Sequence, residues 1–437
     1  MTTLVHEGRV LDPAVRPELR ELSIALLGLG QVGAAVATLA LDPPAALTRR
    51  LRIIGALVRG PARVREPALN GRVPLTTDAV TLLESRPDAL IELLGGVEPA
   101  RSLILAALDR GIPVVTANKS LLARHGDELL DAAARTGTPL RYEASVIAGV
   151  PFLGTFGRRP LASDVKRITG IVNGTTNFIL STMTAEGTSY GDALTQTQRR
   201  GFSEADPSKD VGGIDAAEKL SVLLRQFGGW SVHPDALDVS GIEGVTVGDA
   251  RQAGVFGGAI KPVIHAEWNG HEVAAFAGPA FVSGGHPLAR IDGVQNAVCL
   301  LGRSGELCLA GPGAGPGATA ATVIDDVLEV VDQDRGRHSV ACRRARRPQL
   351  TDAATGWFVR ISAETKFPDG RDVSDLLAAD GVWLRRVSER GRFGNATAQW
   401  LLTYPCSRAR LDRALSAVSA AAGCSTFAIR ALEAYRE

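Results

Sequence analysis

An acidic loop that ends in a lysine-bearing helix is the part of the chain best suited to chemistry. Residues 201–219 read GFSEADPSKDVGGIDAAEK, with carboxylates at Glu204, Asp206, Asp210 and Asp215 and a lysine at Lys219. Glycine and proline predict a turn-rich loop, and the apolar spacing that follows predicts a helix. The carboxylates could hold an ammonium-bearing substrate while the lysine supplies a proton. The alternative is a solvated loop with a surface pair of Asp215 and Lys219, worth about 0.2–0.5 kcal/mol.

A glycine-rich turn near the N-terminus predicts a dinucleotide site. The turn reads GLGQVG and stands between an apolar run, residues 22–27, and an Ala-rich helical stretch. Its first glycine allows the tight turn, the second lets a pyrophosphate approach the backbone, and the third lets the helix and strand pack closely. The helix N-terminus offers free N–H groups to the phosphates. The expected cofactor contacts in this turn are Gly28, Gly30, Gln31, Val32 and Gly33.

The end of the next predicted strand, residues 53–58, indicates which dinucleotide binds. An acidic residue at this point would accept the ribose 2′-hydroxyl of NAD. The sequence instead has Arg59, with Arg63 and Arg65 close behind. Because a cation suits a 2′-phosphate, the sequence favours NADP(H), with NAD(H) still possible. An exposed arginine in an arginine-rich protein is the alternative.

Two further strand ends belong to the same predicted domain. Residues 89–94 form an apolar strand before Gly95, residues 98–109 form a helix, and a short β-branched strand ends at Thr116, just before Lys119. Ligands collect at the carboxyl ends of strands in open parallel sheets, so we expect these residues near the cofactor, with Lys119 also near the substrate. Only six of the 48 basic residues are lysines, and two of them occupy candidate site positions. Arginine could not exchange a proton there, because its pKa stays above about 12.

Several strings carry a family resemblance. They occur in the order GLGQVG, ELLGGVEPA, TANK, YEASVIAGVP, GIVNGTTNFILSTM, GFSEADPSKDVGGIDAAEKL, HPLARIDGVQNAV and GPGAG. Together they resemble homoserine dehydrogenase over about residues 22–330. The resemblance implies reversible NAD(P)-linked interconversion of L-aspartate 4-semialdehyde and L-homoserine, in the branch leading to threonine, methionine and isoleucine. The alternatives are a dehydrogenase of a related amino-acid semialdehyde and a non-catalytic amino-acid sensor that keeps the fold.

The resemblance also implies roles for individual residues. Lys219 corresponds to the family's catalytic lysine, Lys119 to its second active-site lysine, and Asp215 to the carboxylate beside the catalytic lysine. Glu204 and Asp210 match the acidic residues that hold the substrate amino group and hydroxyl. A zwitterionic substrate with a reacting carbonyl needs such groups, including a donor within about 2.6–3.2 Å of the oxygen that becomes an alcohol.

Two more implied sites lie near the nucleotide domain. The resemblance implies a monovalent cation, usually sodium, held by Glu143 and the backbone carbonyls of Val146, Ala148 and Val150. Hard cations prefer oxygen ligands, and the alternative is a buried Glu143 paired with a neighbour.

The second of these sites is the GPGAG loop, Gly311 to Gly315. In the family this loop and the helix after it pack back near the nucleotide, which would make Gly313 and Thr319 cofactor neighbours. A tight structural turn is the alternative reading of the same glycines.

The C-terminal pattern differs from the rest of the chain. From residue 356 it predicts strand, helix, two strands, helix and strand, a βαββαβ order that resembles the amino-acid-binding ACT domains. The resemblance implies threonine as an effector. The predicted ligand loop, KFPDGRD at 366–372, is longer and more charged than the usual Pro-Gly turn. A structural or dimerising module without a ligand is therefore the alternative.

The fold class that follows is α/β. We expect a doubly wound Rossmann-type nucleotide domain, an α+β substrate and dimerisation domain whose last helix packs back on the nucleotide domain, and an ACT-like domain. The family resemblance implies at least a homodimer. The predicted boundaries are a flexible extension (1–20), the nucleotide domain (21–150), the substrate domain (151–330), a basic linker (331–352) and the ACT-like domain (353–437).

Bulk composition is typical of a soluble, cytoplasmic enzyme. A net charge of +1 gives no reason to expect a nucleic-acid or membrane partner. No apolar run reaches the roughly 18–20 residues that span a bilayer, and the N-terminus lacks the cationic-then-apolar order of a signal peptide. The five cysteines have no CxxC spacing, which predicts reduced thiols and no zinc site.

Overall fold

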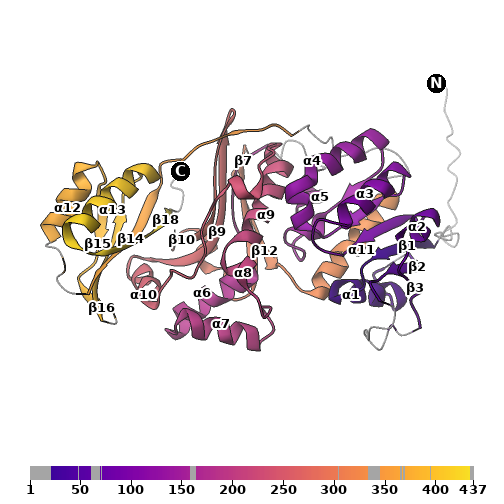
Figure 1. Cartoon of the computed structure of the whole chain (residues 1–437), viewed down its shortest axis with the longest axis horizontal. Helices are drawn as coiled ribbons and strands as arrows, with labels where there is room; N and C mark the ends of the chain where they lie inside the picture. The colour runs from indigo at the N-terminus through magenta and orange to yellow at the C-terminus, as the bar shows by residue number, and fades with distance from the viewer. Residues whose placement is uncertain are drawn as a thin grey trace, which may run out of the picture.

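The computed structural model places the predicted nucleotide-binding elements at one end of an elongated molecule, C-terminal elements at the other, and a large sheet between them (Figure 1). The residues that it describes are 21–47, 49–60, 69, 71–157, 164–303, 305–332, 345–364, 367, 370–393 and 395–433. Several predictions therefore concern residues outside the described ones: the flexible extension, Arg63, Arg65, Lys366 and most of the basic linker.

A six-stranded parallel sheet forms the nucleotide-binding end, in the order β3-β2-β1-β4-β5-β6. The order reverses between β1 and β4, which is the switch point of a doubly wound sheet and opens a crevice at the strands' carboxyl ends. This confirms the Rossmann-type prediction. The strands are β1 (Leu22–Leu27), β2 (Leu51–Leu57), β3 (Leu75–Thr76), β4 (Ala89–Glu92), β5 (Val114–Thr116) and β6 (Leu140–Arg141).

Helices cover both faces of this sheet because alternate strand residues point in opposite directions. Ala25 and Leu27 of β1 pack in the core with α2, α3 and α4, whereas Ile24 and Leu26 pack in the core with α1 and α11. Although α11 lies far from α1 in the sequence, it packs beside α1 (Figure 1). The helices are α1 (Gln31–Leu41), α2 (Ala79–Glu84), α3 (Ala100–Asp109), α4 (Lys119–Thr136) and α11 (Pro316–Asp332).

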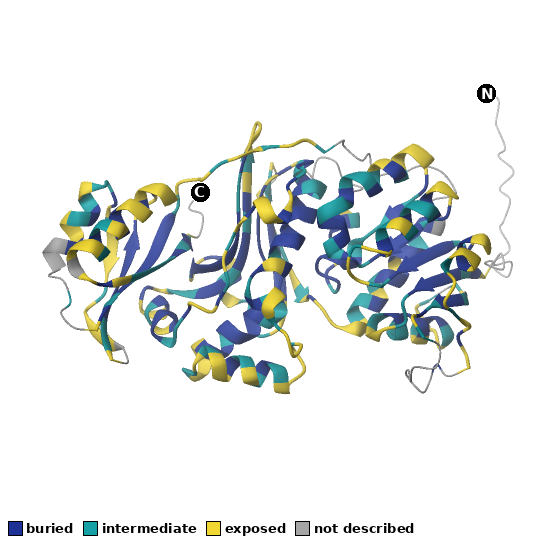
Figure 2. Cartoon of the chain, in the orientation of Figure 1, coloured by how far each residue is buried: buried dark blue, intermediate teal, exposed yellow. Residues whose placement is uncertain are grey.

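A twelve-stranded sheet runs through the rest of the molecule, with the path β12-β11-β7-β9-β10-β18-β14-β17-β15. The short strands β8 (Asp238–Val239) and β13 (Gln349–Leu350) pair with β10, and β16 pairs with β17. Buried residues run along the strands and along the helix faces that meet them (Figure 2). The middle strands are β7 (Val165–Ile171), β9 (Gly258–Asn269), β10 (Glu272–Ser283), β11 (Gln295–Gly302) and β12 (Gly305–Pro312).

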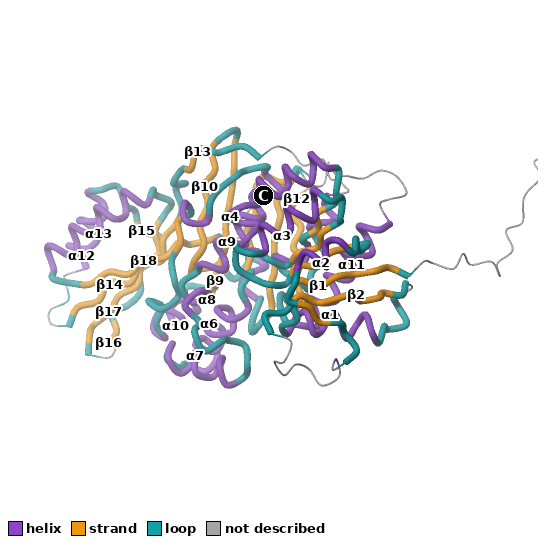
Figure 3. The backbone as a smooth tube through the Cα atoms, turned by 45° about the vertical axis from the view of Figure 1, so that its right-hand side comes forward, coloured by secondary structure: helices purple, strands orange, loops and turns teal. Residues whose placement is uncertain are grey.

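One helix connects this sheet with the nucleotide-binding end. Helix α9 packs on β9 and β10 on one side and on α4 on the other, and α4 and α9 lie side by side in Figure 3. Ala217 and Leu220 of α9 share a core with Ile168 and Val172 of the β7 region. The helices of this part are α5 (Leu153–Gly157), α6 (Gly174–Glu186), α7 (Tyr190–Arg199), α8 (Ser208–Val211), α9 (Ile214–Leu223) and α10 (Val247–Val255).

The C-terminal elements follow the predicted order of strand, helix, strands, helix and strand, with β16 as an added short strand. Their sheet is not separate, since β18 pairs in parallel with β10 through Ala280↔Arg430 and its neighbours. The elements are β14 (Gly356–Ala363), α12 (Gly370–Ala379), β15 (Leu384–Val387), β16 (Gly391–Phe393), β17 (Ala396–Thr403), α13 (Arg408–Ala422) and β18 (Ser425–Leu432).

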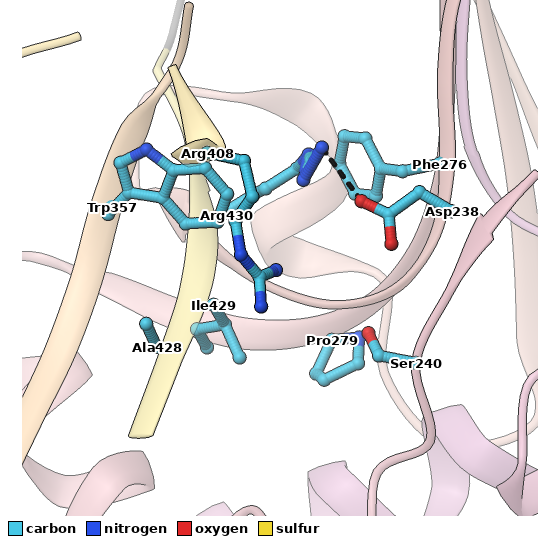
Figure 4. A pocket seen from close by; sticks show the side chains of 9 residues that line it. All are labelled: Asp238, Ser240, Phe276, Pro279, Trp357, Arg408, Ala428, Ile429 and Arg430. Carbon is cyan, nitrogen blue, oxygen red and sulfur yellow. Dashed lines mark ion pairs between the residues drawn. The ribbon is translucent and has the colours of Figure 1, made fainter. Parts of the chain in front are cut away.

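Arginine and aromatic side chains fill the seam between β10 and the C-terminal elements (Figure 4). The Arg430 guanidinium lies 4.7 Å from the ring centroid of Phe276 and 4.9 Å from that of Trp357. One of its nitrogens is 2.8 Å from Asp238 Oδ2, and the Arg408 guanidinium is 5.4 Å from the Trp357 centroid. Cation–π contacts of this kind fix the C-terminal elements against the sheet.

The prediction of reduced cysteines is wrong for one pair. Cys299 of β11 and Cys308 of β12 form a disulfide, with their Cα atoms 4.0 Å apart. The antiparallel register places the two residues directly opposite each other, and spacing along the sequence does not reveal such pairing. Cys406 and Cys424 are free and buried, and Cys342 lies outside the described residues.

No helix in the described ranges combines the length and the apolar character that a bilayer crossing requires.

Candidate active site

A carboxylate shared by two lysines forms the centre of the site. Asp215 is 6 % exposed, and its Oδ1 lies 3.0 Å from Lys119 Nζ while its Oδ2 lies 2.9 Å from Lys219 Nζ. Asn173 Nδ2 donates a third contact to Asp215 Oδ2 at 2.9 Å. The structure therefore brings together Lys119, Asp215 and Lys219, which come from different parts of the sequence.

Helix geometry places these side chains. Asp215 and Lys219 are four residues apart on α9, so they project from the same face. Lys119 begins α4, where Asn118 accepts a hydrogen bond from Leu121 N at 3.1 Å and caps the helix. Because α4 packs on α9, the start of one helix meets the first turns of the other, and the lysines reach the carboxylate from two sides.

Asn173 was not among the candidate residues, yet it organises the acidic part of the site. Its Nδ2 donates to Asp210 Oδ1 at 2.7 Å as well as to Asp215. Its Oδ1 accepts from Thr176 N at 2.8 Å, which caps α6. Asparagine before a predicted helix is a helix-cap signal, and this signal in the NGTT string could have drawn attention to the residue.

The lysines differ in their electrostatic surroundings. Burial lowers the pKa of Lys219 from its usual value, although Asp215 opposes the change. Asp215 raises the pKa of Lys119, which is less enclosed. Burial alone would raise the pKa of Asp215, but Lys219 and Lys119 outweigh it and the pKa falls below the usual range. Asp215 is therefore a fixed negative charge, and Lys219 is the lysine better able to release a proton.

The local contacts orient Lys219 as a donor. Its Nζ donates to the backbone carbonyl of Val172 at 2.6 Å in addition to Asp215. An ammonium has three protons, so one remains for a third partner. The half-buried Asp210 lies nearby, and burial raises the pKa of its carboxyl group.

Glu204 lies outside this cluster. Its side chain is exposed, and the hydrogen bonds that reach the residue, from Gln198 Nε2 at 3.3 Å and Ser203 Oγ at 3.2 Å, go to its backbone carbonyl. Glu204 therefore contacts neither Asp210 nor the lysines in this structure.

The predicted dinucleotide turn has the geometry that its glycines require. Gly28 has φ +107°, and a Cβ there would lie 2.8 Å from Leu93 O. A Cβ on Gly33 would lie 2.5 Å from Gly28 O, whereas the space around Gly30 is open. Helix α1 begins at Gln31 without a side-chain cap, so its first N–H groups, including that of Val32, are free for phosphates. These residues fit a dinucleotide.

The other predicted cofactor neighbours lie at strand ends of the parallel sheet or near the start of α11. Arg59 is exposed just after β2. Gly95 has φ +71° after β4, and Thr116 is buried at the end of β5. Gly313 O accepts from Ala148 N at 3.2 Å, and Thr319 lies in the first turn of α11.

Glu92 is a second buried residue that was not predicted. It is fully buried at the end of β4, where Thr116 Oγ1 donates to its Oε2 at 2.6 Å and Leu94 N donates to its Oε1 at 2.8 Å. Asn118 Nδ2 also approaches Oε1 at 3.4 Å. Glu92 thus holds the segment that leads to Lys119. A single acidic residue at the end of an apolar strand was the available signal.

The carboxylate of Glu143, one of the predicted cation ligands, binds backbone N–H groups in this structure. Glu143 Oε1 accepts from Phe152 N at 2.7 Å and Leu153 N at 2.8 Å, and Oε2 accepts from Gly154 N at 2.6 Å. Burial raises the pKa of Glu143. The Ala148 carbonyl accepts a hydrogen bond from Thr322 Oγ1, and Val146 and Val150 are buried in the same loop.

Comparison with known proteins identifies the family. The pattern described as "Homoserine dehydrogenase" matches residues 151–328, and "Homoserine dehydrogenase, NAD binding domain" matches residues 28–143. A homoserine dehydrogenase of Bacillus subtilis is 35% identical over 380 residues, which cover 84% of this chain and 88% of that protein.

Solved structures agree. A homoserine dehydrogenase from Thiobacillus denitrificans superposes with a TM-score of 0.86 at 30% identity, covering 95% of this chain and 99% of that one. A hyperthermophilic archaeal homoserine dehydrogenase in complex with NADPH superposes with a TM-score of 0.61 at 27% identity, covering 72% of this chain and 98% of that one. The chain belongs to the homoserine dehydrogenase family and is an NAD(P)-dependent oxidoreductase acting on a CH–OH group.

Proposed function

We propose that Lys219 is the proton donor in the reversible reduction of L-aspartate 4-semialdehyde to L-homoserine. The observation that carries this role is the position of Asp215 between the ammonium groups of Lys119 and Lys219. Asp215 holds both lysines in place, and burial of Lys219 eases release of its proton.

The bound nicotinamide would supply the hydride, and the residues of the chain would manage the proton and the substrate charges. In the reduction direction Lys219 Nζ gives a proton to the carbonyl oxygen of the semialdehyde, and in the reverse direction it takes that proton from the homoserine hydroxyl. The Val172 carbonyl keeps the ammonium oriented throughout. Lys119 stays charged beside Asp215 and attracts the substrate carboxylate.

We assign the substrate ammonium and hydroxyl to Glu204 and Asp210. Asp210 supports this role through its position next to Asp215 on the shared Asn173 amide. Glu204 is exposed on the loop before α8, and its role requires that this loop move toward the substrate. The family resemblance is the support for its assignment.

The cofactor is proposed to be NADP(H) in preference to NAD(H). The exposed Arg59 at the end of β2 supports this choice, since a 2′-phosphate would meet a cation there. A structural neighbour solved with NADPH is consistent with it. Cofactor contacts are proposed for Gly28, Gly30, Gln31, Val32, Gly33, Arg59, Gly95, Thr116, Lys119 and Gly313.

A structural sodium ion at Glu143 is also proposed. The carboxylate accepts three amide N–H groups, and about four acceptor sites on a carboxylate leave room for one further ligand. The carbonyls of Val146, Ala148 and Val150 would complete the oxygen set. Replacing sodium by choline at constant ionic strength should lower the melting temperature, and an unchanged value would remove this proposal.

The remaining proposals concern assembly and regulation. We propose a homodimer formed through the substrate-domain sheet, with residues 353–437 as an ACT-like domain that binds threonine. The observed order of strands and helices from β14 to β18 supports the domain assignment. Light scattering would test the dimer, and threonine titration of the full chain would test the effector.

A direct assay tests the central proposal. The purified protein should reduce NADP in the presence of L-homoserine, and should reduce NAD more slowly. Related hydroxy amino acids, such as serine and threonine, serve as matched substrates. Faster turnover of one of these, or no turnover of homoserine with either dinucleotide, would contradict the assignment.

A further inference from the structure

Lys119, Asp215 and Lys219 form an acid–lysine cluster. A separate cleft, which shares no residue with this cluster, is lined by basic side chains. It lies between α4, residues 231–236 and the segment from Arg347 to Leu350, and its volume is about 370 Å³. Pockets for small ligands typically hold roughly 300–1,000 Å³, so a small metabolite fits. The basic residues that line the cleft are Arg124, Arg225, His233 and Arg347.

The carboxylate that lines this cleft belongs to Asp127, and neighbouring side chains already donate hydrogen bonds to it. Arg225 Nε donates to Asp127 Oδ1 at 2.9 Å, and Ser231 Oγ donates to Asp127 Oδ2. Arg225 also donates to the Leu122 carbonyl at 3.1 Å. This group therefore forms the wall of the cleft, and the Asp127 carboxylate does not pair with Arg124 or Arg347.

Arg347 presents its side chain from a fixed backbone. Next to it, Arg346 N donates to Gly229 O at 2.8 Å, and Arg346 O accepts from Ser231 N at 2.8 Å. The Arg347 side chain is exposed and has no hydrogen-bond or ion-pair partner within the described part of the chain. The segment that contains it then crosses toward the C-terminal elements (Figure 1). A guanidinium with no partner among the described residues thus lines the cleft.

Arg124 faces the same space with only loose partners. Its nitrogens lie 3.4 Å from Asp235 Oδ1 and 3.7 Å from Glu218 Oε1, longer than the roughly 2.7–2.9 Å of a strong charge-assisted hydrogen bond. A closer anion could therefore draw the guanidinium toward the cleft.

The contact with Glu218 connects the cleft to the acid–lysine cluster. Glu218 Oε2 accepts from Ser120 Oγ at 2.6 Å. Ser120 follows Lys119 on α4, and Glu218 precedes Lys219 on α9. A change at Arg124 therefore alters the residues that join the two helices beside both lysines.

We propose that this cleft binds a small, multiply charged anion, a phosphate or a polycarboxylate, between Arg124 and Arg347, and that its occupancy changes turnover through the contact of Arg124 with Glu218. Guanidinium groups suit these anions because their planar N–H fork matches two oxygens at once. The effect on turnover rests on the proposed roles of Lys119 and Lys219, whereas binding does not.

Isothermal titration calorimetry of the full chain tests binding. The protein is first saturated with NADP so that the dinucleotide site is filled, and ionic strength is held constant because exposed charges are screened by salt. Citrate and inorganic phosphate are the two probes. At least one should bind saturably, and Arg347→Gln should weaken it at least tenfold. The probe that binds more tightly distinguishes a carboxylate ligand from a phosphate ligand.

Arg392→Gln is the matched control, since it removes one positive charge at an exposed position of β16. It should leave binding unchanged. If neither probe binds the wild-type protein, or if both variants weaken binding equally, the cleft is not an anion site.

Initial rates at saturating homoserine and NADP test the effect on turnover. Adding the binding probe should change kcat at least twofold in the wild-type protein and not in Arg347→Gln. Binding without a change in kcat would refute the connection through Arg124 and leave the anion site intact. A failure of the proposed function itself is distinguishable, because the wild-type protein would then be inactive before any probe is added.

Discussion

Two buried aspartates in this molecule show how the partner of a carboxylate decides its use. Asp215 lies between the two lysines of the acid–lysine cluster. Asp249 lies where α10 meets the C-terminal strands, and its carboxylate is bound by Arg360 and by Trp400 Nε1 at 2.7 Å. Both are nearly or fully buried, at 6 % and 0 % exposure. Burial of a charged group is therefore not by itself a sign of catalysis.

The two carboxylates differ in whether their partners can release a proton. Arginine keeps its proton at every relevant pH, whereas a buried lysine can release one. Asp249 also receives hydrogen bonds from Thr246, which makes a capping box at the start of α10, so its acceptor sites are filled. Around Asp215 the lysines retain protons for a further ligand. The arginine contact of Asp249 therefore joins structural elements, whereas the lysines beside Asp215 keep protons that a further ligand can accept.

Removal of the Lys219 amine should change activity more than any other substitution proposed here, and it tests the role of the lysines beside Asp215. Lys219→Ala should lower kcat by about 10²–10⁴-fold, the usual contribution of general acid–base catalysis, with little change in NADP binding. The control is Lys261→Met, because Lys261 is a buried lysine paired with Asp292 at 2.6 Å outside the cluster. It should lower stability and leave kcat per folded molecule unchanged. Turnover of Lys219→Ala within tenfold of wild type would contradict its role.

Neutralising Asp249 should affect stability instead. Asp249→Asn leaves Arg360 without its buried counterion, and losing one partner of a buried pair typically costs about 3–5 kcal/mol. Chemical denaturation should show a lower free energy of unfolding, while kcat of the folded fraction stays near wild type. A variant with normal stability and reduced kcat would reverse the contrast between the two aspartates.

Substrate recognition should be sensitive to the acidic residues around the cluster. A hydrogen bond to a charged group contributes about 1.5–3 kcal/mol, and each 1.4 kcal/mol is a factor of ten. Glu204→Gln and Asp210→Asn should therefore raise the KM for homoserine about ten- to hundredfold, with little change in the KM for NADP. Unchanged homoserine kinetics in both variants, with stability intact, would assign these carboxylates to the solvated surface.

The pH dependence of the reaction should reflect the pKa of Lys219. Reduction of the semialdehyde needs the protonated lysine, so kcat should fall as pH rises through a pKa that burial lowers from the usual value of about 10.4. Homoserine oxidation needs the neutral lysine and should show the opposite slope. In Asp215→Asn the opposing negative charge is lost, so the pKa should fall further and the basic limb should move to lower pH. A shift of the basic limb to higher pH in Asp215→Asn would contradict this arrangement.

Cofactor preference should respond to a charge at the edge of the site. Arg59→Asp should weaken NADP more than NAD, because a carboxylate repels a 2′-phosphate and can accept from a 2′-hydroxyl. We expect a several-fold change in the ratio of the two KM values, since Arg59 is exposed and salt screens it. The same ratio in both proteins would show that Arg59 does not contact the cofactor.

Sequence patterns predicted the local elements well where strands and helices have strong signals. Strand β1 has the predicted bounds, and β5 ends at Thr116 as expected. The predicted strand over residues 89–94 is shorter in the structure, because Glu92 turns to accept hydrogen bonds from Leu94 and Thr116. Glu92 therefore ends β4 and holds β5 through Thr116. An acidic residue at the end of an apolar strand is a local signal, but its partner on the neighbouring strand cannot be read from the local sequence.

The sequence by itself determined the residue types of the chemistry: scarce lysines, a carboxylate loop, and glycines between a strand and a helix. Each of these signals lies within a few residues, where spacing alone reports turn geometry and helix faces. Only the tertiary structure decided that Asp215 joins both lysines, that Asn173 ties Asp210 to Asp215, and that Cys299 faces Cys308. Such contacts depend on how helices pack and how strands align, and those are set by burial of apolar faces across the whole chain.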